Sequence, residues 1–228
     1  MRNVWHPMNQ SGLWRRLPRW TRIAVGMAAA TALVKAATQI FIQLSPRATP
    51  PGVSFLLHSP IRRGYRRPDQ TAHQFRLASG HQVLEIGGGT GTFTVPLAKQ
   101  VAPDGRLYSI ELQSAMLRQQ ARRVATSGVA NVRLHQADAV RLPFADTCFD
   151  RAVVIAVLPM LRDKQRALRE IKRVLKPGAL LAVSEELAEP EYVPPIVTRR
   201  WCERAGFQHV VTYRERWFYV SIFQLHTG

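Results

Sequence analysis

The sequence predicts an α/β fold: a doubly wound, seven-stranded sheet with a terminal antiparallel hairpin, preceded by an N-terminal hydrophobic helix. Three observations predict it. Apolar runs of strand length alternate with runs of helix length beyond residue 80, as in parallel strands joined by crossover helices. Only 214–216 separate the last two strand-like runs, which is too short for a crossover. Upstream, the 22 residues of 23–44 contain a single charge, Lys35.

Charge is distributed unevenly along the chain. The net charge is +17, and residues 1–80 hold twelve Lys or Arg against one acid, Asp69. Such a segment favours anionic lipid, nucleic acid or an acidic substrate as a partner. Because 27 of the 32 cations are arginine, a composition bias of the source genome explains the excess equally well. Cys148 and Cys202 belong to no metal-binding or disulfide pattern and fit a reducing compartment.

Residues 1–22 form a basic segment in which tryptophans alternate with arginines, including Trp5, Trp14, Arg15, Arg16, Arg19, Trp20 and Arg22. At a membrane–water interface the indole ring lies at headgroup depth while guanidinium groups meet lipid phosphates. We therefore expect this segment to contact a membrane surface. The alternative is a disordered basic tail.

Residues 23–44 are long enough to span a bilayer. Against spanning, a central lysine costs about 2.5–3.5 kcal/mol on insertion scales. Polar residues about three and four apart also form a stripe, as in a helix that lies in the interface plane: Thr31, Lys35, Thr38, Gln39 and Gln43. We expect a membrane-associated helix, either spanning or lying flat. A soluble helix and a cleaved secretory signal are the alternatives.

Residues 45–80 are expected to form a linker and a cover for the domain that follows. The linker is rich in proline, and a helix is expected over 69–78, ending at Gly80. Between them lies a cluster of four arginines, Arg62, Arg63, Arg66 and Arg67. We expect this cluster to be a solvated surface, and a site for an anionic substrate group is the alternative.

The rest of the chain is organised around the stretch 83–92. An apolar strand carrying Glu85 breaks into four glycines and resumes as a helix. Strand, glycine turn and helix form a nucleotide site, because glycine lets the backbone approach a ligand and the helix N-terminus offers N–H groups. Gly87, Gly89 and Gly91 have the spacing G-x-G-x-G, whereas the dinucleotide pattern needs its last glycine one position later, where threonine stands. A glycine turn that binds nothing is the alternative.

From about residue 81, strands and helices alternate. The expected strands are 82–86, 106–111, 131–135, 150–156, 179–184, 207–213 and 217–225, and the expected helices are 92–102, 113–127, 163–175 and 196–205. A helix lies between successive strands in most of this order, and the last pair must form a hairpin. Five parallel strands closed by a terminal hairpin are therefore predicted.

Two further acids end strands at the edge that carries the glycines. Glu111 ends the second strand, about 20 residues beyond the glycine loop, where a carboxylate accepts hydrogen bonds from ribose hydroxyls. NAD-binding proteins share that feature. Asp138 follows the third strand. Either acid alone is also compatible with a helix cap or a turn, but three strand-terminal acids and a glycine loop in this order favour a nucleotide site.

The glycine stretch with Glu85 resembles motif I of the class I S-adenosylmethionine-dependent methyltransferases. The resemblance covers about residues 75–225, including Leu142-Pro143-Phe144 and Lys176-Pro177-Gly178, and is strongest to the quinone- and sterol-type branch. It implies a Rossmann-like domain at 81–228, S-adenosyl-L-methionine as the cofactor, and adenine contacts from the Asp138 carboxylate and the Ala139 N–H. The cofactor-binding residues implied are Glu85, Gly87, Gly89, Thr90, Gly91, Glu111, Leu112, Asp138 and Ala139.

The resemblance implies no catalytic residue. Methyl transfer from a sulfonium is an in-line displacement with a neutral leaving group, so positioning and desolvation supply most of the acceleration. If the acceptor must lose a proton early, the candidate bases are Glu185, Glu186 and His58, and a structural role is the alternative for each. The stretch 158–160 stands where many members carry a histidine, so no catalytic histidine is implied.

We therefore expect a membrane-associated methyltransferase, with its catalytic domain in the cytoplasm, that acts on a small lipophilic acceptor such as a lipid or a quinone. One alternative is an NAD(P)-dependent oxidoreductase. Another is a non-catalytic module that binds nucleic acid or a protein partner through residues 1–80. The core offers no aromatic and basic platform for single-stranded nucleic acid, so nucleic acid is the less favoured partner.

Overall fold

The computed structural model describes residues 18, 21–22, 25–26, 66–189 and 191–225. The chain divides into two compact units, 1–46 and 47–228. Most of the expected basic segment, most of the expected 23–44 helix and most of the linker lie outside the described residues, although Thr21, Arg22, Val25 and Gly26 are helical. Among the residues that are described, no helix combines the length and the apolar character needed to cross a bilayer.

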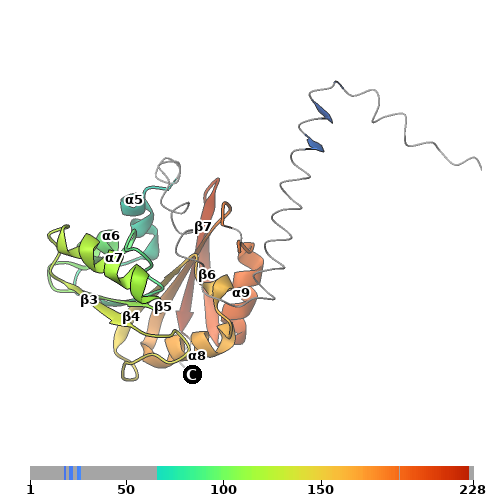
Figure 1. The fold of residues 1–228 in the computed structure, drawn as a ribbon. Helices are drawn as coiled ribbons and strands as arrows, with labels where there is room; N and C mark the ends of the chain where they lie inside the picture. The colour runs from blue at the N-terminus through green and yellow to red at the C-terminus, as the bar shows by residue number, and fades with distance from the viewer. Residues whose placement is uncertain (1–17, 19–20, 23–24, 27–65, 190, 226–228) are drawn as a thin grey trace, which may run out of the picture. The chain divides into compact units, whose positions relative to one another are not determined.

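The second unit is built on a seven-stranded sheet with the order β3-β2-β1-β4-β5-β7-β6 (Figure 1). The strands are β1 (Gln82–Ile86), β2 (Arg106–Glu111), β3 (Val132–Gln136), β4 (Phe149–Ile155), β5 (Leu175–Glu186), β6 (Phe207–Arg214) and β7 (Phe218–Leu225). Neighbours among β1 to β5 are parallel, and β7 lies antiparallel between β5 and β6. The predicted doubly wound sheet with a terminal hairpin is confirmed.

Helices cover both faces of the sheet. They are α5 (Pro68–Ala72), α6 (Thr94–Val101), α7 (Ser114–Ala125), α8 (Lys164–Val174) and α9 (Pro195–Arg204), with 3₁₀ turns at His73–Phe75 and Leu158–Met160. Figure 1 shows α5, α6 and α7 gathered on one side and α8 and α9 on the other. Side chains alternate between the two faces, so Leu84 and Ile86 pack in the core with α8 while Val83 packs in the core with α6.

The prediction of a helix over 69–78 is wrong, because the observed helix is shorter. α5 ends at Ala72, a 3₁₀ turn continues to Phe75, and Arg76 adopts a left-handed conformation with φ of 54°. A residue in this conformation ends a helix, as a C-terminal glycine would. The ring of Phe75 is fully buried against the ring of Phe93, with centroids 6.3 Å apart, so tertiary packing fixes this early stop.

The fifth strand is longer than the expected 179–184. It starts at Leu175, which pairs with Phe149, and the register between β4 and β5 then shifts before Arg151. Gly178 has a φ of 73° inside this irregular part. The Lys-Pro-Gly turn is therefore present as a bulge within the strand, because a local turn need not end a strand whose flanks both pair with the same neighbour.

Candidate active site

The loop after β1 has a backbone that requires glycine. Gly87, Gly89 and Gly91 have φ angles of 68°, 57° and 84°, a region that side chains with a Cβ rarely adopt. The N–H groups of Gly87 and Gly88 donate to the carbonyl oxygen of Ile110 at 2.9 and 3.1 Å, which fastens the loop to β2. The G-x-G-x-G spacing thus corresponds to three positive φ angles in one tight turn.

Gly88 is required for a different reason, which is space. A Cβ at this position would lie 2.2 Å from both Gln120 Nε2 and Ser109 Oγ, and 2.9 Å from Glu85 Oε2. The loop therefore lies directly on a layer of buried polar side chains. Any side chain at Gly88 would have to displace that layer.

Glu85 belongs to this layer, beneath the glycine loop. Its carboxyl group accepts hydrogen bonds from Thr94 Oγ1, at 2.7 Å, and from the Ser109 hydroxyl. Gln120 Nε2 donates to these two hydroxyl oxygens at 2.8 and 2.6 Å. Burial raises the pKa of Glu85 to about 7, because desolvation of the charged form outweighs the donors. The layer supports the loop from below, and a direct contact of Glu85 with a cofactor stays a prediction.

Glu111 ties the loops after β1 and β2 together. Its Oε2 accepts from the Gly89 N–H at 2.9 Å, and its Oε1 accepts from the Gln113 N–H at 2.8 Å. Each carboxylate oxygen keeps a further lone pair, so the group can still accept hydrogen bonds from a diol. An acid at this strand end therefore both shapes the glycine loop and offers an acceptor beside it.

The remaining predicted cofactor residues reach the same edge. The Ala137 N–H donates to the Glu111 carbonyl at 3.2 Å, so the ends of β2 and β3 lie side by side. Leu112 and Asp138 are exposed there, and Asp138 Oδ1 accepts from a backbone N–H two residues later at 3.1 Å. Ala139 and Thr90 are buried. The structure thus places all nine predicted residues in or next to the loops after β1, β2 and β3.

Arg66 corrects the expectation of a solvated arginine cluster. Arg67 is exposed as expected and Arg62 and Arg63 lie outside the described residues, but Arg66 is 2% exposed. Arg66 pairs with the carboxylate of Glu186 and donates to Ser184 Oγ at 2.7 Å.

The guanidinium of Arg66 also lies between two aromatic rings. Its central carbon is 4.7 Å from the ring centroids of both Phe93 and Phe218. The sequence carried one signal for this site, because two adjacent acids at the end of an apolar strand need a cation when they are buried. Of the candidate bases, Glu186 is therefore held by Arg66, Glu185 beside it is 1% exposed, and His58 lies outside the described residues.

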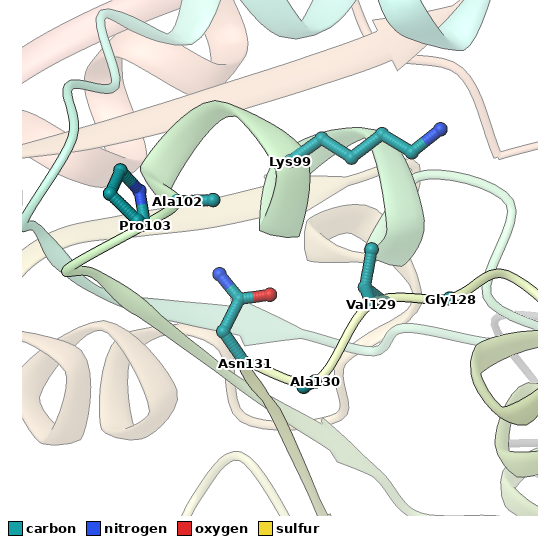
Figure 2. A pocket seen from close by; sticks show the side chains of 7 residues that line it. All are labelled: Lys99, Ala102, Pro103, Gly128, Val129, Ala130 and Asn131. Carbon is teal, nitrogen blue, oxygen red and sulfur yellow. The ribbon is translucent and has the colours of Figure 1, made fainter.

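A hollow of about 300 Å³ lies at the opposite edge of the sheet (Figure 2). It is lined by Lys99, Ala102, Pro103, Gly128, Val129, Ala130 and Asn131. Asn131 points into it, but its amide already donates to the carbonyl oxygens of Ala98 and Gly105 at 2.8 and 3.2 Å. Ligands of such sheets bind beyond the carboxyl ends of the strands, and this hollow lies at the amino ends, so we assign it no role in the site.

Comparison with known proteins identifies the family. Residues 83–178 match the methyltransferase domain family. The match runs from β1 into β5 and includes the glycine loop, Glu111 and Asp138. Residues 83–178 are thus identified as a methyltransferase domain.

Curated relatives of this methyltransferase domain carry quinone-related names. The ubiquinone/menaquinone biosynthesis C-methyltransferase UbiE of Pasteurella multocida is 41% identical over 107 residues, which are 46% of this chain and 40% of the relative. The UbiE of Marinomonas sp. is 35% identical over 159 residues, 69% of this chain and 61% of the relative. The chain thus spans about half the length of the curated relatives that it matches.

Solved structures share the fold of the methyltransferase domain. A SAM-dependent methyltransferase from Aquifex aeolicus superposes with a TM-score of 0.73 at 24% identity, covering 78% of this chain and all of that one. The [4+2]-cyclase SpnF superposes with a TM-score of 0.62 at 20% identity, covering 71% of this chain and 80% of its own. These likenesses establish the fold, and a cyclase among them shows that the fold alone does not determine the reaction.

Proposed function

We propose that this methyltransferase domain transfers a methyl group from S-adenosylmethionine to a carbon atom of a lipophilic, quinone-like acceptor. The observation that carries the proposal is the glycine loop of β1, fastened through Gly89 to the carboxylate of Glu111. The names of the UbiE relatives support carbon as the accepting atom and a quinone as the acceptor class. A reduced quinone ring is rich in electrons, which a carbon nucleophile requires.

The residues at this edge fit the cofactor. The positive φ angles of Gly87, Gly89 and Gly91 bring bare backbone to the ligand side of the loop, and the Glu111 carboxylate accepts from ribose hydroxyls. The exposure of Leu112 and Asp138 at this edge supports contacts with the adenine ring. When bound, S-adenosylmethionine supplies a methyl group on a positively charged sulfur. The chain's contribution is to hold and orient the two reactants and to exclude water.

Exposed apolar side chains support a lipophilic acceptor. Most of the large apolar side chains that are exposed in the described part of the chain lie at the carboxyl edge, next to the proposed site: Leu112, Met160, Leu187, Ile196 and Trp217. The Leu187 N–H donates to the Trp217 carbonyl at 2.8 Å, so two of them are direct neighbours. Apolar groups gathered at one edge favour a ligand or a surface of the same character.

Calorimetry and a product assay test the proposal. We expect S-adenosylhomocysteine to bind, NADH and NADPH not to bind, and Gly89→Val to abolish binding while the protein remains folded. Incubation with labelled S-adenosylmethionine and chemically reduced demethylmenaquinone should give a labelled product that mass spectrometry places on the ring carbon. Tight NAD(P)H binding, or label on oxygen or nitrogen alone, would overturn the proposal.

The proposal extends to the membrane, because the run 23–44 holds a single charge and a Trp/Arg segment precedes it. These segments bring the domain to the cytoplasmic membrane face, where a lipophilic acceptor dissolves. Deleting residues 1–45 should leave cofactor affinity unchanged and release the protein from sedimenting vesicles. Turnover on acceptor embedded in vesicles should fall, while turnover on detergent-dispersed acceptor persists. Full-length protein that stays in the high-speed supernatant with vesicles present would contradict this extension.

A further inference from the structure

Glu185 occupies a distinct position at the end of β5. Consecutive side chains of a strand point to opposite faces, so Glu186 meets Arg66 on one face and Glu185 lies on the other. Glu185 pairs in register with Tyr219 of β7, and its side chain is 1% exposed. It is therefore a buried carboxyl group on the opposite side of the sheet from the Arg66 ion pair.

The polar groups around Glu185 are satisfied without it. Ser184 Oγ donates to the Tyr219 carbonyl at 2.6 Å and accepts from Arg66. The Tyr219 hydroxyl lies 2.5 Å from Thr198 Oγ1 and donates to the Val193 carbonyl at 3.0 Å. Glu185 Oε1, by contrast, is buried with no hydrogen-bond partner in the described part of the chain. Buried polar atoms are usually hydrogen-bonded, so this oxygen keeps hydrogen-bonding capacity that a ligand can use.

A short chain of contacts connects Glu185 to the glycine loop. A Cβ at Gly87 would lie 2.6 Å from Val157 Cγ2, so the segment after β4 packs against the loop. The N–H of Ala156, next to Val157, donates to the Ser184 carbonyl at 2.8 Å. Glu185 follows directly. The ends of β1, β4 and β5 thus form one continuous edge, with the glycine loop at one end and Glu185 at the other.

We infer that Glu185 is the acid–base residue of the transfer, and that its Oε1 binds a ring hydroxyl of the acceptor and takes up the hydroxyl proton. This inference rests on the proposed function and deepens it, because it assigns the acceptor a hydroxyl group next to the methylated carbon. An aromatic hydroxyl is the donor that this buried oxygen lacks, and the position beyond β4 and β5 lies beside the proposed cofactor site.

The proposed transfer conserves atoms and charge. As the hydroxyl proton moves to Glu185, the ring carbon next to the hydroxyl forms a bond to the methyl carbon. The methyl–sulfur bond breaks and its electron pair stays on sulfur. The methylated carbon then loses its own hydrogen to water as a proton, and Glu185 returns its proton to the ring oxygen. The aromatic ring is restored, and one proton is released in total.

The surroundings of Glu185 suit a base for this proton. Burial raises the pKa of Glu185 well above its usual range, Glu189, Glu186 and Glu191 raise it further, and Arg66 opposes the shift. Tyr219, whose own pKa is raised by burial, is the other titratable group beside it. Because the pKa of Glu185 is raised, it lies nearer to the pKa of a phenol. Proton transfer is most effective when the two pKa values are close. The rate must then rise as pH rises through the pKa of Glu185.

Steady-state kinetics on reduced demethylmenaquinone test the inference with Glu185→Gln, using Glu191→Gln as the matched control. Glu185→Gln should lower kcat by about 10²-fold or more, abolish the acidic limb of the pH profile, and leave cofactor affinity unchanged. Glu191→Gln removes the same charge from the same acidic segment and should keep both kcat and the limb. Wild-type kcat and an unchanged limb in Glu185→Gln would overturn the inference.

A binding experiment decides the matter without turnover. Glu185→Gln should bind 1-naphthol about tenfold more weakly than wild type, and should bind 1-methoxynaphthalene, which has no hydroxyl donor, equally well. Equal loss for both probes would overturn the inference. Hydroxyl-dependent loss in a protein with no turnover on the quinol would support the inference and overturn the proposed acceptor. If Glu185→Gln fails to fold, Glu185→Asp decides, because a retained carboxylate must keep the acidic limb.

Discussion

Buried acids lie at both ends of the carboxyl edge of the sheet, but they differ in their hydrogen-bond and ion-pair partners. At the β1–β2 end, Glu85 and Glu111 have hydroxyl or backbone donors for their carboxyl groups. At the β5 end, Glu186 is neutralised by Arg66, and Glu185 Oε1 has no donor within the described residues. The sheet is continuous between them, so the contrast arises from the helices and loops that cover each end.

The difference indicates that acids at one end support the structure of the loop, while an acid at the other end is available to react. The hydrogen bonds around Glu85 hold the layer of side chains beneath the glycine loop, and they are already formed in the folded chain without a ligand. A carboxyl group whose oxygen lacks a donor has its hydrogen-bonding capacity left for a ligand. We therefore associate the β1–β2 end with holding the cofactor and the β5 end with the acceptor. Substitutions at four residues of this edge test the division.

Arg66→Ala should have the largest effect. It removes the arginine that pairs with the buried Glu186 carboxylate, and breaking a buried ion pair typically costs about 3–5 kcal/mol of the free energy of unfolding. Urea denaturation measures this, with the exposed neighbour substitution Arg67→Ala as the control, expected within about 0.5 kcal/mol of wild type. The double variant Arg66→Met/Glu186→Leu should recover most of the loss. A cost below 1 kcal/mol for Arg66→Ala would contradict a buried pair.

Glu85→Gln should change how stability depends on pH. The pKa of Glu85 is about 7 in the folded chain against a usual 4.5, so between these values the folded state holds a proton that the unfolded chain releases. Stability from Glu85 is therefore present below pH 4.5 and is lost as pH rises to about 7, about 3 kcal/mol in total. Glutamine cannot titrate, so the difference between wild type and variant in urea denaturation should decline over this window. A pH-independent difference would show that Glu85 is ionised throughout.

Glu111→Ala should weaken S-adenosylhomocysteine binding by about 1.5–3 kcal/mol, the scale of charge-assisted hydrogen bonds. The fold should survive, because the acid lies at a strand end facing the ligand side. The affinity falls for two reasons. The ribose hydroxyls lose their acceptor, and the N–H groups of Gly89 and Gln113 lose theirs, which loosens the loop. Calorimetry on a correctly folded variant measures it. Wild-type affinity would remove Glu111 from the site.

Ser109→Ala should have the smallest effect, about 1 kcal/mol of the free energy of unfolding. It removes one donor to Glu85 and one acceptor of Gln120, and Gln120 keeps its contact with Thr94. Cofactor affinity should change little, because the φ angles of the loop do not depend on Ser109. A cost above about 3 kcal/mol would mean that the layer beneath the loop acts as one cooperative unit.

The elements of the sheet were predictable because their signals are local. The bounds of β1 and β2 agree with the prediction to the residue, since apolar alternation and adjacent turn residues mark them. The expected helix from residue 69 failed because the packing of Phe75, and not a local signal, ends it. Local rules describe an element until a tertiary contact competes with them.

The candidate site was predictable in position but less so in detail. The order of strands places Glu111 and Asp138 near the glycine loop from topology alone. That Glu85 lies beneath the loop depends on which strand face α6 and α7 cover, and the partner of Arg66 lies 120 residues away in the sequence. No pattern within a short window of sequence contains that pairing, because only the folded chain brings the two residues together.

Because residues far along the chain enclose Arg66, its burial can be completed only late in synthesis. Phe218, which covers one side of its guanidinium, leaves the ribosome about 150 residues after Arg66. At about 5–20 residues per second the arginine is therefore not fully enclosed until roughly 8–30 seconds later. β7 must also insert between β5 and β6, so a strand made after both of its neighbours completes that part of the sheet. Until then the growing chain holds a solvated arginine and an open sheet edge, and a chain released before residue 218 would leave Glu186 without its covering strand.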